Sequence, residues 1–296
     1  MKTWLRKPSF WGYLFISPWL IGFLVFTAGP MLTSLFLSFH IYDLHRMEYV
    51  GTENYVRLFT VDPVFWKSLR VTLIYAFVAV PIGVVGSLAL AVLLNQPVRG
   101  QPLFRTLYYM PSLVPAVASA LVWQWVFNTD NGALNAILGW FGGPAIAWLQ
   151  DERYTLSAFV LMSLWGIGGG RMVIFLAGLQ GIPDSYLEAA TLDGAGPLRR
   201  FMKITLPLLS PVFFFNVVMG FIGAFQVFTS AYVMTGGGPN NASRFYALYL
   251  FQTAFEQFKL GKASAMAWVL FFIIALITAG QFLASRKLVY YERAGS

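Results

Sequence analysis

The chain has 296 residues, of which 58% are apolar and only 11% are charged. A soluble domain carries about a quarter charged residues, so this composition excludes an ordinary water-soluble core and favours a protein buried in a bilayer. The sequence has no cysteine, which excludes disulfides, thiol catalysis and thiolate metal sites. The net charge of +8 could suggest a nucleic-acid partner, but an uneven distribution of Lys and Arg across a membrane explains it more simply.

Six stretches are long and apolar enough to cross a bilayer, for which a helix needs about 20 mainly apolar residues. They lie at about 10–36, within 71–94, and at about 106–127, 154–179, 207–233 and 263–284. We therefore predict an all-α integral membrane protein with about six transmembrane helices. The first is expected to be a retained helix rather than a cleaved signal peptide, because no charge occurs from Pro8 to Phe39.

A further apolar stretch, Phe245 to Phe258, is too short to span, so an interfacial or re-entrant helix is expected there. If it did span, the C-terminus would move to the other side of the membrane. With the N-terminus inside, the cytoplasmic segments hold eleven Lys and Arg and four acids, and the outer segments hold eight of each. This bias favours a multi-pass protein with both termini in the cytoplasm.

The segment between the fourth and fifth spans has the sequence of a short capped helix. Ser185 and Glu188 have the S-x-x-E spacing of a capping box, with Ser185 as the N-cap. Gly194 is well placed to end the helix, and Pro197 hinders its continuation. We predict a helix of about two turns, followed by the basic segment 199–203. From these features alone, a connector that merely joins two spans is the simplest interpretation.

The same loop resembles the EAA motif of binding-protein-dependent ABC importers. Glu188-Ala189-Ala190 is followed after three residues by Gly194, and after nine more by Ile204-x-Leu206-Pro207. In that family the helix is the coupling helix, which docks into a cleft of the ATP-hydrolysing subunit. The resemblance implies a fold of the type I ABC importer permease type and one transmembrane permease domain, 1–296, with a coupling loop at about 181–206. The residues to which it assigns coupling are Glu188, Ala189, Ala190, Asp193 and Gly194.

Other segments resemble the carbohydrate branch of these importers, in particular its maltose-F-type permeases. They are Val50-Gly51-x-Glu53-Asn54-Tyr55, Leu107 to Pro111, Phe175 to Pro183, Phe225 to Phe228 and Met234 to Pro239. The resemblance implies a bacterial inner-membrane subunit that imports a sugar or oligosaccharide together with a second permease, two ATP-binding subunits and an extracytoplasmic sugar-binding protein. The chain has no G-x-x-x-x-G-K-[ST] loop. We therefore expect a non-catalytic subunit that binds no cofactor and leaves ATP and Mg to a partner.

The fourth and fifth spans are expected to carry the substrate, because in the resembled family these two helices line the sugar cavity. Three consecutive glycines, 168–170, predict either a kink or close helix packing. Arg171 is the only charge within a span, and it either serves the pathway or a subunit contact, or snorkels to the inner interface. The pathway candidates are Ser163, Trp165, Gly170, Arg171, Asn216, Gly220, Ala224, Gln226 and Val227.

Two alternatives differ in cargo or in class. Arg171 is compatible with an anionic or sulfated sugar, or with a glycerol-phosphate or other polyol derivative. An ion-coupled secondary transporter needs acids or histidines inside the membrane, whereas every acid falls in a predicted loop or tail. His40 and His45 share an outer loop without further ligands, so we expect no metal site. No catalytic triad or carboxylate pair stands out, and no nucleic-acid partner is expected.

Overall fold

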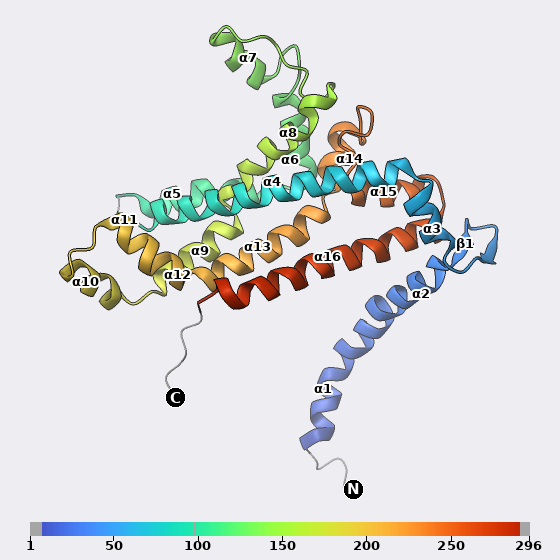
Figure 1. Cartoon of the computed structure of the whole chain (residues 1–296), viewed down its shortest axis with the longest axis horizontal. Coiled ribbons are helices and arrows are strands. Elements are labelled where there is room, and N and C mark those ends of the chain that lie inside the picture. Colours follow the sequence, from blue (N-terminus) through green and yellow to red (C-terminus); the bar gives the residue numbers. More distant parts are fainter. Residues whose placement is uncertain (1–7, 98, 291–296) are drawn as a thin grey trace. The chain divides into compact units, whose positions relative to one another are not determined.

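The computed structural model describes residues 8–97 and 99–290, which are mostly helical (Figure 1). The predicted positions of the two termini fall on residues 1–7 and 291–296, outside this described part. The chain divides into two compact units, one with residues 1–62 and 250–271 and the other with residues 63–249 and 272–296. Each unit is described by itself below.

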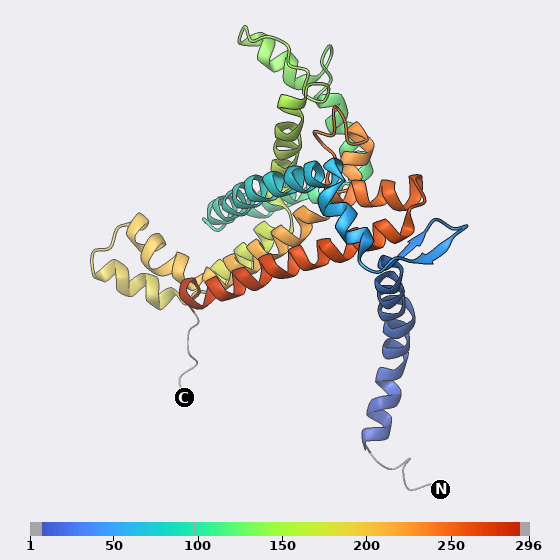
Figure 2. The same ribbon diagram turned by 45° about the vertical axis from the view of Figure 1, so that its right-hand side comes forward.

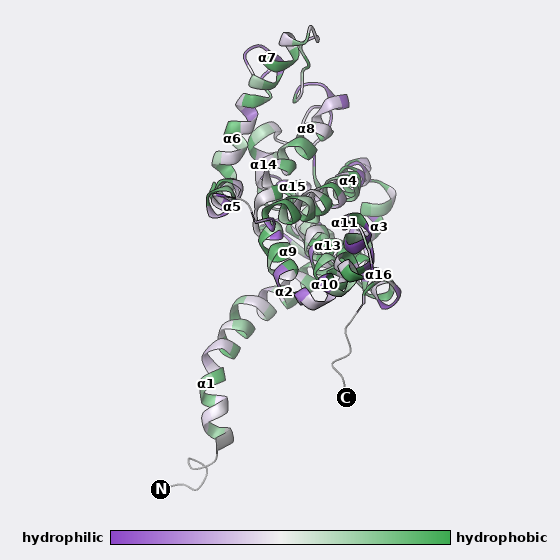
Figure 3. Cartoon of the chain, turned by 90° about the vertical axis from the view of Figure 1, so that its left-hand side faces the viewer, coloured by the Kyte–Doolittle hydropathy of each residue, from purple (hydrophilic) through white to green (hydrophobic). Residues whose placement is uncertain are grey.

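The first unit begins with a long apolar helix. Its segments are α1 (Pro8–Phe23), the π-helical η2 (Leu24–Ala28) and α2 (Gly29–Ser38). Together they form a candidate span over Phe10–Ser38, and none of its most apolar window is buried within the chain. Green and white predominate along α1 and α2 in the hydropathy colouring of Figure 3. The first predicted span is therefore confirmed, and lipid or another protein must cover its surface.

A two-stranded hairpin follows α2 and is a small exception to the all-α prediction. Strands β1 (His40–Tyr42) and β2 (Met47–Tyr49) pair antiparallel, with His40 opposite Tyr49 (Figure 2). The next helix, α3 (Glu53–Thr60), supplies the buried Asn54, whose Nδ2 donates to the carbonyls of Ser38 and His40, each at 2.9 Å. The Asn-Tyr pair of the outer-loop motif thus has a structural role, because Asn54 ties the hairpin to the end of α2.

The second unit is built around one long helix, α4 (Pro63–Leu94), which packs against α8, α9 and α13. The last helix, α16 (Leu260–Leu288), begins in the first unit and ends in the second. The remaining segments are α5 (Gln101–Tyr109), η3 (Met110–Leu113), α6 (Ala116–Val126), α7 (Ala133–Trp140), α8 (Glu152–Leu164), η4 (Trp165–Gly168), α9 (Gly170–Gln180), α10 (Asp184–Leu192), α11 (Pro197–Arg200), η5 (Phe201–Thr205), α12 (Leu206–Leu208), α13 (Ser210–Phe225), α14 (Thr229–Thr235), α15 (Tyr246–Phe251) and η6 (Gln252–Glu256).

About six membrane spans are present, as predicted, but only some are straight. Among the described residues, three helices are long and apolar enough to cross a membrane, over 10–38, 63–94 and 260–287. Three bent pairs of helices bring the total to six when each pair counts as one span. The stretch at 245–258 forms only α15 and η6, which are too short to span on their own.

Each bend has a local chemical cause. The 95° bend follows η3, where Val114 is extended before Pro115, as the residue before a proline prefers to be. The 65° bend precedes α13, where Pro211 lacks an N–H and the Ser210 hydroxyl instead donates to the Pro207 carbonyl at 2.6 Å. A 42° bend between α8–η4 and α9 falls at the glycine run. The sequence therefore predicts where these spans lie better than it predicts their shape.

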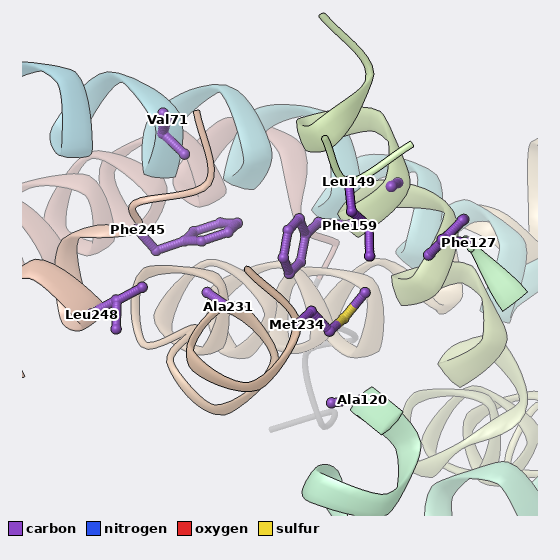
Figure 4. Close-up of a cluster of buried hydrophobic side chains, with 10 residues drawn as sticks. Val71, Ala120, Phe127, Leu149, Phe159, Ala231, Met234, Phe245 and Leu248 are labelled. Atoms are coloured by element: carbon purple, nitrogen blue, oxygen red, sulfur yellow. The ribbon is translucent and has the colours of Figure 1, made fainter. Parts of the chain in front are cut away.

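A hydrophobic cluster holds α6, α8, α14 and α15 against α4 (Figure 4). The ring of Phe245 meets Phe159 of α8 at 5.4 Å and Tyr75 of α4 at 5.1 Å between centroids. Next to these rings, the backbone N–H of Tyr246 donates to the buried Thr72 hydroxyl at 2.8 Å. The cluster thereby fixes the helices that surround a small polar cavity.

Candidate functional site

The predicted loop helix is present as α10, but it begins differently from the prediction. Pro183 precedes the first helical residue, and no side chain caps that end. The prediction of a capping box with Ser185 as the N-cap is therefore wrong. The helix starts at Asp184, and Ser185 already lies in its first turn. Asp184 instead places a negative charge in the first turn, where the helix dipole favours it.

The predicted end of α10 at Gly194 is confirmed in detail. Gly194 has a φ of 75°, and its N–H bonds the Thr191 carbonyl at 3.0 Å. The N–H of Ala195 reaches back to the Ala190 carbonyl at 2.9 Å, which completes a Schellman motif. Pro197 does not merely stop a helix, since it begins the next one, α11. Arg200 then donates to the Thr191 hydroxyl at 2.7 Å and ties α11 back to α10.

One face of α10 is open, and the opposite face borders a groove. On the open face Glu188 is exposed, and Leu192 at the end of the helix is 89% exposed. Ala190 is buried towards the groove, which has a volume of about 440 Å³. The groove lining brings the two halves of the EAA-like motif together, since it contains Tyr186, Ala189, Ala190, Asp193, Lys203, Ile204, Pro207, Leu208 and Tyr290.

A second candidate site is a polar cavity of about 190 Å³ beside the hydrophobic cluster. Two predicted pathway residues, Ser163 and Trp165, line it, and the ring of Trp165 meets Trp123 edge-on at 5.8 Å. Tyr75 and Ser119 also line it and were missed by sequence reasoning, because neither belongs to a motif or to a polar stripe of its helix. The full lining is Tyr75, Pro111, Ser119, Phe159, Met162, Ser163, Trp165, Gly166 and Ser230.

The glycine run beside this cavity satisfies both predictions made for it. The chain bends by 42° between Gly168 and Gly170. A Cβ placed on Gly168 would lie only 2.1 Å from the backbone oxygen of Tyr108, and one on Gly169 would lie 3.1 Å from Cβ of Ser112. The run therefore provides a kink and also close packing of η4 against α5 and η3.

Arg171 reaches across the helix bundle from the first turn of α9. A Cβ on the buried Gly83 of α4 would lie 2.8 Å from its Nη1, and a Cβ on the buried Gly220 of α13 would lie 3.5 Å from its Nη2. The side chain is half-buried, and it forms no ion pair or hydrogen bond with any residue in the described part of the chain. Arg171 and Gly220 are thus the predicted pathway residues that the fold brings into contact.

The other predicted pathway residues do not gather at one point. Asn216 is buried in α13 and donates to the Val212 carbonyl of its own helix at 2.9 Å. Ala224 is also buried, whereas Gln226 is exposed at the end of that helix. Val227 packs on the hydrophobic cluster. Gly170 is exposed and has open space where a side chain would be.

Residues 79–289 match the family described as the inner membrane component of binding-protein-dependent transport systems. The chain belongs to this family. It is a permease of a binding-protein-dependent ABC transporter, a non-catalytic, multi-pass subunit of the inner membrane that works with a binding protein.

Relatives and solved structures agree with this assignment. The permease is 47% identical over 293 residues to the probable ABC transporter permease protein YesP of Bacillus subtilis (strain 168), covering 97% of this chain and 94% of that protein. It is 34% identical to the lactose transport system permease protein LacF of Rhizobium radiobacter, covering 93% and 94% of the two chains. The same fold occurs in a bacterial alginate ABC transporter in complex with a periplasmic protein, with a TM-score of 0.85, 19% identity and 97% and 98% coverage.

Proposed function

We propose that this permease forms, with a second permease, the translocation pathway of a sugar importer, and that α10 is its coupling helix. The observation that carries the proposal is the groove beneath α10, where Ala189 and Ala190 meet Ile204 and Pro207. The two separated parts of the EAA-like motif, at 188–194 and 204–207, therefore line one groove. We further propose that residues 1–296 act as one permease domain, whose cytoplasmic loop at about 181–206 faces the ATPase.

The shape of α10 suits the transmission of force. Its Schellman end and the Arg200–Thr191 hydrogen bond brace the helix, so a displacement of its exposed face would pass to α11 and onward to α13. Glu188 presents charge to a partner surface on the open face, while Ala189 and Asp193 border the groove beneath the helix. ATP binding to the two ATPase subunits, which hold ATP and Mg, would draw the coupling helices together and open the pathway outward. Hydrolysis would reset the pathway inward.

Two observations support a sugar as the cargo: the name of a relative and the side chains that line the polar cavity. LacF is named for lactose transport. In this chain, Ser119, Ser163 and Ser230 offer hydroxyl groups that can bond sugar hydroxyls. The indole of Trp165 offers an apolar face against which a sugar ring can pack. We propose that the cavity and the kinked path beside it carry the sugar, along helices that hold Gly170, Arg171, Asn216, Gly220, Ala224, Gln226 and Val227.

The test is reconstitution of the permease with its partner subunits and binding protein in lipid vesicles. We expect sugar-loaded binding protein to stimulate ATP hydrolysis and sugar uptake. Glu188→Lys should abolish both while the complex still assembles, because a reversed charge would stand on the docking face. Glu53→Lys in the outer loop is the matched control and should leave both intact. Unchanged activity in Glu188→Lys would overturn the coupling assignment, and a complex that no sugar stimulates would overturn the cargo assignment.

A further inference from the structure

The guanidinium of Arg171 is a cation inside a membrane span, and within residues 8–97 and 99–290 no carboxylate pairs with it. No Asp or Glu occurs between residues 63 and 129 or between 194 and 255, which include the helices that flank it, α4 and α13. A charged side chain within the bilayer is costly, and such residues are retained mainly where they serve a substrate or a partner. An anion from a substrate or a partner subunit would therefore balance the charge of Arg171.

The helices on either side of Arg171 have glycine where they approach its guanidinium. Glycine stands on both neighbouring helices at the points nearest to its two terminal nitrogens, Gly83 at Nη1 and Gly220 at Nη2. A side chain at Gly83 would displace the guanidinium, because the 2.8 Å separation is shorter than real Cβ contacts. Two glycines on separate helices thus make room for the guanidinium between α4 and α13.

The cation also adjoins the polar cavity. Tyr75 lines the cavity from α4, the same helix whose Gly83 lies against the guanidinium of Arg171. The hydroxyl groups of Ser163 and Ser230 and the indole of Trp165 complete the side of the cavity that a sugar ring would meet. The cavity and the guanidinium of Arg171 therefore share α4 as a common wall within one helical unit.

We propose that Arg171 is an anion subsite of the translocation pathway and that the cargo is an acidic sugar. Its guanidinium would bind the carboxylate, or the equivalent sulfate or phosphate, of the sugar with paired hydrogen bonds, since its planar fork matches these groups. The inference rests on the proposed function, because it names the substrate class of the same pathway.

The test measures uptake of paired sugars by the complete importer in vesicles. The probes are uronate di- and trisaccharides and their methyl esters, which keep the skeleton but lose the charge. Sulfated disaccharides and glycerol phosphodiesters distinguish a carboxylate from the other anions. The binding protein is titrated with each probe beforehand, so that uptake is compared at saturation.

We expect Arg171→Gln to lower uptake of the charged probe about tenfold or more and to leave uptake of any neutral sugar or ester that the binding protein accepts within about twofold. Arg171→Lys should fall between, because it keeps the charge but loses the fork. Gly83→Ala should lower uptake of the charged probe in the wild-type background and add no further loss in Arg171→Gln. Gly86→Ala, which crowds Ile167 at 2.7 Å instead of Arg171, is the matched control.

Two results would overturn the inference and leave the proposed function standing. One is a binding protein and importer that accept only neutral sugars. The other is an Arg171→Gln complex that loses assembly or loses uptake of all sugars equally, which would assign the counter-charge to the second permease. A complex that no sugar drives would instead contradict the proposed function itself.

Discussion

Gly194 shows how one residue sets the geometry of the loop. Its φ of 75° lies in the left-handed region, which glycine enters without the strain that a Cβ imposes. That conformation lets the backbone of Gly194 and Ala195 close the Schellman motif at the end of α10. The rigidity of the proposed coupling helix therefore depends on the absence of a side chain at this position.

Gly194→Ala should weaken the coupling of transport to ATP hydrolysis. A Cβ at this position would destabilise the left-handed conformation by about 1 kcal/mol, so the end of α10 would loosen. We expect a several-fold drop in binding-protein-stimulated ATPase activity of an assembled complex. Gly196→Ala is the control, because Gly196 has a φ of −66° and open space around it. Equal activity of the two variants would contradict the role given to Gly194.

Asn54 has a comparable influence on the outer hairpin. Asn54→Ala would leave the buried carbonyls of Ser38 and His40 without their donor, at a cost of about 1–3 kcal/mol. We expect the hairpin to open more often and trypsin to cleave after Arg46 several-fold faster than in the wild type. Thr52→Ala, an exposed position whose side chain makes no capping bond, should not change the rate. The interpretation fails if the two variants are cleaved alike.

At the scale of elements, hydropathy predicted the spans, and Gly194 predicted the end of the loop helix, because both signals are local. The bends were less predictable, since Pro115 and Pro211 change direction inside stretches that remain apolar throughout. The capping box failed because Pro183 sets the start of α10 one residue before Ser185 could cap it. The sequence predicted only part of the cavity lining. Tyr75 and Ser119 line the cavity only because the fold packs α4 and α6 beside α8.

The glycine run gives a prediction about helix packing. Gly168→Ala should force η4 away from α5, because the new Cβ would lie 2.1 Å from a backbone oxygen that no side-chain rotation can move. We expect the Tm of the purified complex to fall by several degrees, at about 2–4 °C per kcal/mol of lost stability. Gly170→Ala, two residues further on, has open space for its Cβ and should match the wild type. A larger loss for Gly170→Ala would refute this packing.

At the scale of the whole molecule, the family assignment places the chain in the inner membrane, and the charge bias predicts the direction of each span. The predicted orientation puts the loop that contains α10 and both termini in the cytoplasm, with the segment around α7 outside. The absence of cysteine makes this orientation accessible to single-cysteine labelling without background from the chain itself.

An impermeant maleimide applied to spheroplasts should label Asn131→Cys and spare Leu198→Cys, although both positions are exposed. Permeabilised cells should label both, which controls for reactivity. Labelling of Leu198→Cys in intact spheroplasts would place the proposed coupling loop on the outer face, where no ATPase subunit could reach it.

The most direct test of the central claim is a photo-cross-link from the end of α10 in the assembled importer. A benzophenone amino acid at Leu192, which is 89% exposed, should cross-link to the ATPase subunit. The same probe at Phe141, which is 85% exposed in the segment after α7, should not. A cross-link from position 192 alone is the predicted result. A complex that assembles and hydrolyses ATP but gives no cross-link from position 192 would contradict the assignment of α10 as the coupling helix.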